Sequence, residues 1–160
     1  MQRFGDNVDT DQIIPGEFCH LPDVRELGQK AFFHVRPEFV RRVESGENIV
    51  VAGEGWGSGS SREQAAWALK GAGVRCVIAR SFAYIHKRNL VNEALPFLIL
   101  RDEDFYRRAA DGAEVALDLA AGTVTLAGRA YHGESLPAVM TGIMAHGGLV
   151  AEVKSKLAAN

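Results

Sequence analysis

The sequence predicts an α/β domain with a mixed sheet. Two apolar runs, 48–52 and 74–79, flank a helical segment, so strand, helix and strand form a unit with parallel strands. Between 114 and 132, three short segments separated by glycine-containing turns predict an antiparallel meander. At 160 residues the chain is long enough to bury a core, and we expect one domain over 1–160.

The N-terminal third predicts short elements. The polar residues 6–11 lead into 13–16 (Ile-Ile-Pro-Gly), which predicts an extended piece closed by a turn. Residues 23–30 predict a short helix. Residues 37–45 predict a helix that opens with a proline, buries one apolar face and stops at Gly46.

The later elements alternate between strand and helix. The segment 82–93 predicts a helix with Phe82, Ile85 and Leu90 on its apolar face. Within it His86 has no partner at ligand spacing, so we interpret it as a packing or hydrogen-bonding residue rather than a metal ligand. The remaining predicted elements are a strand at 97–100 and helices at 103–111, 137–147 and 148–156.

The loop 53–64 (Gly-Glu-Gly-Trp-Gly-Ser-Gly-Ser-Ser-Arg-Glu-Gln) is the candidate site. Its glycines at alternate positions permit positive φ and close approach of a ligand. Ser61 and Gln64 have the spacing of a capping box, which predicts a helix whose N-cap is Ser61. A helix N-terminus favours an anion, and the guanidinium of Arg62 matches a carboxylate.

Nucleotides are disfavoured as the anion. A P-loop needs Lys before Ser or Thr after its last glycine, and this loop has no Lys. The dinucleotide fingerprint fails because Ser60 stands where its third glycine belongs. The alternative that the serines only cap a helix stays open.

Composition excludes other classes. The hydrophobic fraction of 47% is that of a globular protein, and a net charge of −2 gives no electrostatic reason to expect nucleic acid. Cys19 and Cys76 form no Cys-x-x-Cys unit, so we expect two reduced thiols, and no zinc or iron–sulfur cluster held by this chain alone. We see no signal peptide or membrane-spanning run and expect a cytoplasmic protein.

Three segments together resemble a known family. Residues 59–66 resemble the Gly-Ser-Ser-Arg-Glu-[His/Gln]-Ala motif of the aconitase superfamily swivel domain. Residues 5–15 are similar to the opening of the small subunits of isopropylmalate and homoaconitate dehydratases, and 81–96 to a later block of the same domain. The resemblance implies a three-layer β/β/α swivel domain with a partly open, barrel-like sheet.

The same resemblance implies an aconitase-type hydro-lyase that dehydrates and rehydrates a hydroxy acid. Ser60 would be the base, acting as alkoxide, and Ser61 and Arg62 would bind a substrate carboxylate. Asp11 would support a histidine of the larger part, although it could instead be a turn or cap residue. A four-iron four-sulfur cluster would be held by a separate large subunit, so we expect an obligate hetero-oligomer, a heterodimer, that is inactive without that partner.

The substrate, a small di- or tricarboxylic hydroxy acid, would be read by the loop 18–25. An arginine at its third position suggests a carboxylate side chain and an aliphatic residue an alkyl one, and here the residue is His20. Arg25 could bind a second carboxylate. The first hypothesis is isopropylmalate dehydratase of leucine synthesis, followed by homoaconitase of lysine synthesis and a methylmalate-type dehydratase.

Two other classes stay open at this point. A non-catalytic carboxylate- or anion-binding module predicts binding by the isolated chain and no effect of Ser60→Ala on a partner's turnover. A structural domain that only docks on a partner predicts that Arg62→Lys is tolerated.

Overall fold

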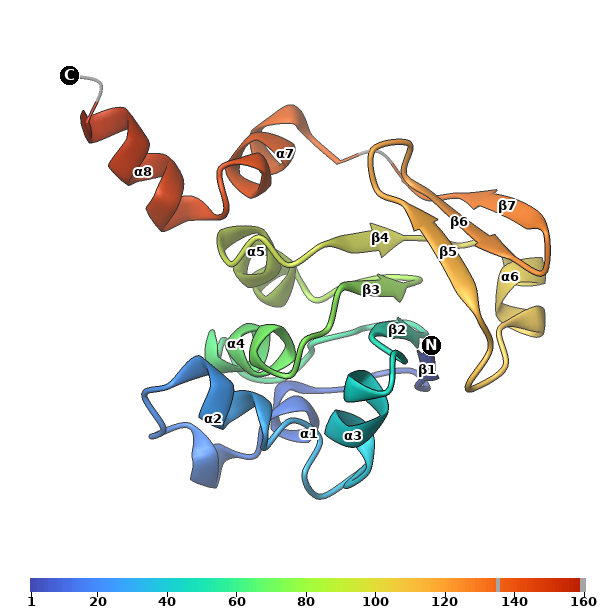
Figure 1. Ribbon diagram of the computed structural model, residues 1–160, viewed down its shortest axis with the longest axis horizontal. Coiled ribbons are helices and arrows are strands. Elements are labelled where there is room, and N and C mark those ends of the chain that lie inside the picture. The colour runs from blue at the N-terminus through green and yellow to red at the C-terminus, as the bar shows by residue number, and fades with distance from the viewer. Residues whose placement is uncertain (135, 159–160) are drawn as a thin grey trace.

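The computed structural model describes residues 1–134 and 136–158 of the chain, which form two sheets and the helices around them (Figure 1). The elements are β1 (Gln2–Arg3), α1 (Thr10–Ile13), the 3-10 helix η1 (Gly16–Phe18), α2 (Val24–Gly28), α3 (Phe39–Glu44), β2 (Ile49–Ala52), α4 (Gln64–Gly71), β3 (Cys76–Ala79), α5 (Tyr84–Asn92), β4 (Phe97–Ile99), α6 (Glu103–Arg108), β5 (Val115–Asp118), β6 (Thr123–Leu126), β7 (Arg129–His132), α7 (Ala138–Ala145) and α8 (Leu149–Ala158).

The α/β class with parallel and antiparallel strands is confirmed, and the two kinds of pairing lie in separate sheets. Strands β1 to β4 pair in parallel in the order β1-β2-β3-β4, which includes the predicted parallel unit of β2, α4 and β3. Strands β5, β6 and β7 form the predicted antiparallel meander.

The two sheets and the helices make three layers. Figure 1 shows the parallel sheet between α4 and α5 on one side and the antiparallel sheet with α6 on the other. Alternate residues of β3 enter different cores, with Val77 and Ala79 on the helix side and Cys76 and Ile78 on the side of the antiparallel sheet. Because both faces are buried, the strand is a continuous apolar run.

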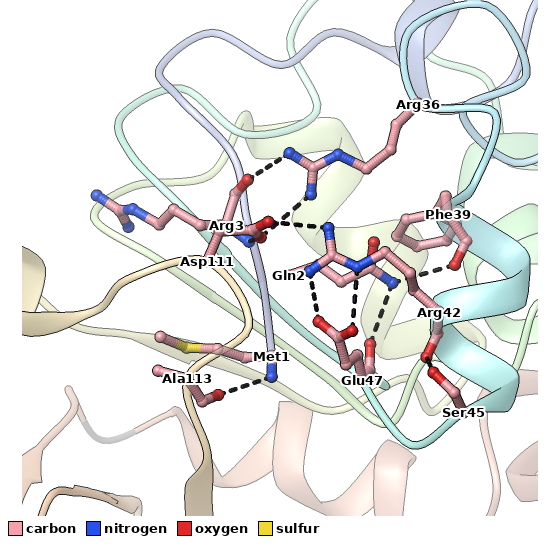
Figure 2. Close-up of polar contacts among 10 residues, drawn as sticks. All are labelled: Met1, Gln2, Arg3, Arg36, Phe39, Arg42, Ser45, Glu47, Asp111 and Ala113. Atoms are coloured by element: carbon pink, nitrogen blue, oxygen red, sulfur yellow. Dashed lines mark hydrogen bonds and ion pairs between the residues drawn. The ribbon is translucent and has the colours of Figure 1, made fainter.

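The first strand, β1, was not predicted from the sequence. Tertiary contacts hold this strand, as drawn in Figure 2: Gln2 Nε2 donates to the carbonyl of Glu47 over 3.1 Å. The backbone N–H of Arg3 donates to Asp111 over 2.7 Å. Arg42 pairs with both Glu47 and Asp111, which raises the pKa of its guanidinium. A two-residue polar strand is therefore fixed by distant residues.

Two local predictions were wrong. The segment 13–16 is not one extended piece, because Ile13 ends helix α1 and Gly16 begins η1, with Ile14 extended between them. Ile85 is half exposed, and α5 buries His86, Leu90 and Val91 instead.

Candidate functional site

The residues predicted for the site gather at one edge of the parallel sheet. The chain leaves β1, β2 and β3 through residues 4–9, 53–63 and 80–83. Because these strands run parallel, their carboxyl ends lie at the same edge. This is the edge at which α/β proteins place ligands.

The glycine-rich loop that follows β2 is hydrogen bonded to both of its neighbours. On one side the N–H of Gly57 donates to the carbonyl of Val8 over 2.7 Å. On the other, Trp56 accepts from the N–H of Ala83 over 2.8 Å and donates to the carbonyl of Ser81 over 3.1 Å. The loop is therefore fixed by backbone contacts over much of its length.

The predicted positive φ angles occur at Gly55, Gly57 and Gly59, with values of 67°, 76° and 91°. At Gly57 two features require glycine, the positive φ and the lack of space for a Cβ. A Cβ added there would overlap the Cγ and Cδ2 atoms of His86, well inside van der Waals contact. The buried imidazole thus packs directly beneath the loop.

The predicted capping box at Ser61 is wrong. Helix α4 begins at Gln64, its N-cap is Glu63, and no side chain caps it. Ser60 and Ser61 precede the helix as exposed residues outside regular structure. The N–H of Ser60 donates instead to the hydroxyl of Thr10 over 3.1 Å, a contact that local spacing could not reveal.

Arg62 lies between Asp11 on helix α1 and Gly16 at the start of η1. Its Nη1 donates to the carboxylate of Asp11. This hydrogen bond is the largest cause of the raised pKa of Arg62. The guanidinium also packs against Gly16, where an added Cβ would lie 3.3 Å from Nη2. The fold therefore brings together the predicted residues Asp11 and Arg62.

Helix α1 places Asp11 for this contact. A capping box forms here, between Asp9 and Gln12: the N–H of Gln12 donates to Asp9 over 2.8 Å, and Gln12 accepts from the N–H of Asp9 over 3.0 Å. Asp9 is thus a cap residue, whereas Asp11 in the first turn is exposed and ion paired.

His20 and Arg25 lie on the segment that follows Gly16. His20 is exposed, and its Nδ1 lies 2.7 Å from the carbonyl oxygen of Glu17. Arg25 is exposed in the first turn of α2, where its backbone N–H donates to the N-cap Asp23. In the described part of the chain, neither side chain pairs with Ser60, Ser61 or Arg62.

Two further residues support the site: Thr10, which sequence reasoning missed, and His86, which it interpreted as a packing or hydrogen-bonding residue. Thr10 is completely buried and hydrogen bonded to Ser60. His86 is 2% exposed, burial lowers its pKa to about 4, and neither ring nitrogen has a hydrogen-bond partner among the described residues. The sequence signal available for Thr10 was its position next to Asp11, within the segment 5–15 that carries the family resemblance. The packing role of His86 was predicted, whereas its contact with the loop at Gly57 was not.

The described residues do not fit a metal cluster. Across 1–134 and 136–158, no three His, Cys, Asp or Glu side chains are grouped so that they could hold a metal ion. Burial in β3 raises the pKa of the Cys76 thiol to about 12, which is unsuited to a thiolate ligand. No helix in these ranges has the length and apolar character to cross a membrane.

Fold and site together define an α/β domain that presents two exposed serines and an arginine at the carboxyl edge of a parallel sheet. Comparison with known families specifies it further. The model of the aconitase C-terminal domain matches residues 1–102, and the chain belongs to this family.

Relatives cover nearly the whole chain. The 3-isopropylmalate dehydratase small subunit of Lachnoclostridium phytofermentans is 40% identical over 99% of this chain and 96% of that protein. The methanogen homoaconitase small subunit of Methanothermobacter thermautotrophicus is 45% identical over 92% of this chain and 85% of that protein. A crystal structure of 3-isopropylmalate dehydratase from Methanocaldococcus jannaschii superposes with a TM-score of 0.90 at 36% identity, over 99% and 93% of the two chains.

Proposed function

We propose that this chain is the small subunit of an iron–sulfur hydro-lyase that isomerises a hydroxy acid by dehydration and rehydration. The first substrate proposed is 2-isopropylmalate, converted to 3-isopropylmalate in leucine synthesis. The observation that carries the proposal is the group of exposed Ser60 and Ser61 and half-buried Arg62 beside Asp11, which offers a base and a carboxylate fork but no Lewis acid.

Ser60 is the proposed base. As an alkoxide it would take a proton from the carbon next to the hydroxyl-bearing carbon and become a neutral hydroxyl, so the alkoxide that precedes this step needs positive potential. The helix N-terminus contributes less than its sequence suggests, because α4 begins four residues later and the field of the macrodipole falls off within the first turn. Arg62 and groups of the partner subunit therefore supply most of the stabilisation in this proposal.

Arg62 and Ser61 are the proposed carboxylate ligands. In the free chain the guanidinium donates to Asp11, and the remaining N–H groups of its fork can still meet a carboxylate. On assembly, Asp11 would turn from Arg62 to a histidine of the large subunit and leave the fork to the substrate. Both changes are inexpensive because the pair is solvent exposed.

The four-iron four-sulfur cluster belongs to the large subunit in this proposal, and it supplies Lewis acidity toward the departing hydroxyl group. The poor fit of this chain's residues to a metal supports that division of labour. We also propose a cytoplasmic location, which suits the two free thiols of Cys19 and Cys76.

Homoaconitase is the second candidate, favoured by the 45% identity to the methanogen small subunit. The choice between the two substrates is assigned to the segment after Gly16, since this segment begins against Arg62 and carries His20. Arg25 is proposed as the residue that would meet a second carboxylate on a longer substrate.

The test is reconstitution with the large subunit of the same organism and a panel of isopropylmalate, homocitrate and methylmalate. We expect Ser60→Ala to assemble normally and to lose turnover by at least about a thousandfold, whereas Ser45→Ala, a serine on the opposite side of β2 in sequence, keeps it. Turnover by the chain alone, or full turnover by assembled Ser60→Ala, would refute the proposal.

A further inference from the structure

Thr10 contacts the backbone of Ser60 with both functions of its hydroxyl group. Thr10 Oγ1 accepts from the N–H of Ser60 over 3.1 Å and donates to the carbonyl of Ser60 over 3.4 Å. The two residues are 50 positions apart in sequence. Thr10 is completely buried, whereas Ser60 is exposed. One buried side chain thus satisfies both polar backbone groups of the exposed serine.

The rest of Thr10 is fixed as firmly as its hydroxyl. Its own N–H donates to the carbonyl of Ser58 over 2.9 Å. It occupies the first position of helix α1, directly after the N-cap Asp9. Three hydrogen bonds therefore join Thr10 to two residues of the glycine-rich loop.

The loop needs such a support on this side. Gly59 precedes Ser60 with φ of 91°. Because glycine can adopt many other backbone conformations, it does not by itself fix the direction of Ser60. A Cβ on Gly59 would lie 3.4 Å from Thr10 Oγ1, so the backbone passes close to the hydroxyl. Beyond Ser60 the chain stays irregular until α4 begins at Gln64. Among the described residues, the Ser60 backbone makes its hydrogen bonds with Thr10.

We propose that Thr10 is a positioning residue for Ser60: its buried hydroxyl fixes the peptide groups of Ser60 and so the direction of the serine side chain. The inference rests on the proposed role of Ser60 as the base. Because Asp11 follows Thr10 in the same helical turn, α1 orients the partner of Arg62 and the backbone of Ser60 together. A misplacement of about 1 Å in a reacting group can cost about a hundredfold in rate.

The experiment compares two variants of Thr10 in the enzyme assembled with its large subunit. Thr10→Val keeps the shape and removes the hydroxyl, and Thr10→Ser keeps the hydroxyl and removes the methyl group. We expect kcat to fall about 10- to 100-fold in Thr10→Val with KM within about threefold. Thr10→Ser should stay within about threefold of the wild type. If Thr10→Val does not fold, Thr10→Ala takes its place in the same comparison.

A second readout does not depend on activity. Amide hydrogen exchange of Ser60, measured by NMR in the isolated full chain, should accelerate at least about tenfold in Thr10→Val and remain slow in Thr10→Ser. The control for stability alone is Val43→Ala, which truncates a buried residue of α3 and should leave kcat and the Ser60 exchange rate unchanged.

Either of two results in Thr10→Val would overturn the positioning role: unchanged Ser60 exchange, or wild-type kcat while Ser60→Ala is inactive. An equal fall of kcat in Val43→Ala would also overturn it, since the effect would then follow stability. If Ser60→Ala is itself fully active, the proposed function fails, and the exchange measurement still decides whether Thr10 fixes the Ser60 backbone.

Discussion

Asp11 accepts a hydrogen bond from the guanidinium of Arg62 across 51 residues of sequence. The Asp11 side chain is 60% exposed and that of Arg62 30%. Exposed ion pairs contribute between zero and about 1 kcal/mol to stability. The pair therefore contributes little to stability, and under the proposed function its two members would exchange partners when a substrate and a second subunit bind.

Removing the charge of Asp11 should separate function from stability. We expect Asp11→Asn to change the free energy of unfolding of the isolated chain by less than about 1 kcal/mol. Turnover of the assembled enzyme should fall at least about tenfold. Urea unfolding and steady-state kinetics measure the two effects. The matched control is Glu103→Gln, which weakens the exposed pair with Arg80 and should leave turnover unchanged. Normal turnover in Asp11→Asn would contradict a role at the site.

Arg62→Lys tests the carboxylate fork. A lysine keeps the charge but cannot form two parallel hydrogen bonds with one carboxylate. We expect kcat/KM of the assembled enzyme to fall about 10- to 100-fold, because a hydrogen bond to a charged group contributes about 1.5–3 kcal/mol. Arg101→Lys, an exchange in the exposed pair with Glu134, is the control. If Arg62 served only to dock the partner, the exchange would leave kcat/KM near the wild-type value.

Gly57→Ala should destabilise the chain more than the backbone angle alone explains. Gly112 has a similar φ of 81° with no atom within 4 Å of an added Cβ, so Gly112→Ala measures the cost of positive φ, about 1–2 kcal/mol. Gly57→Ala adds overlap with His86, for a further loss of about 1–3 kcal/mol. Urea unfolding gives both values. His86→Ala should recover part of the excess in a double-mutant cycle, and additive effects would argue against the contact.

The burial of His86 predicts a dependence of stability on pH. Its pKa is lowered from 6.5 to about 4, so the unfolded chain binds more protons and the free energy of unfolding falls as the pH drops through this interval. The full contribution is roughly 3 kcal/mol at 1.36 kcal/mol per unit. We expect His86→Phe to flatten urea-unfolding stability between pH 7 and 4, and the exposed His132→Gln to preserve the slope. An equal slope in His86→Phe would disprove the assignment.

Much of the fold could be predicted because the relevant signals are local. The β-branched run of β2 and the glycine stop after α3 depend on neighbouring residues, and these elements formed as predicted within a few residues. Strand β1 could not be found in this way. Gln2 and Arg3 are polar and the strand is short, so it forms only because β2 lies alongside and distant groups bind the amide nitrogen of Gln2 and the backbone N–H of Arg3.

The candidate site likewise combines residues that could be predicted from the sequence with contacts that only the fold creates. Ser60, Ser61 and Arg62 were identified from their own motif, whereas the predicted cap at Ser61 failed because its spacing took no account of Thr10. The N–H of Ser60 donates to a hydroxyl 50 residues away, and helix α4 begins only at Gln64. The burial of His86 beneath Gly57 likewise needed the glycine-rich loop and helix α5 to be brought together.

The sequence by itself determined the chemical groups of the site and the order of most helices and strands, since side-chain chemistry and short-range periodicity are properties of neighbouring residues. The tertiary structure alone decided which of these groups meet: Asp11 with Arg62, Thr10 with Ser60, and His86 with Gly57. The physical reason is that hydrogen bonding and burial depend on distances in space, and parallel strand pairing brings distant segments to one edge of the sheet.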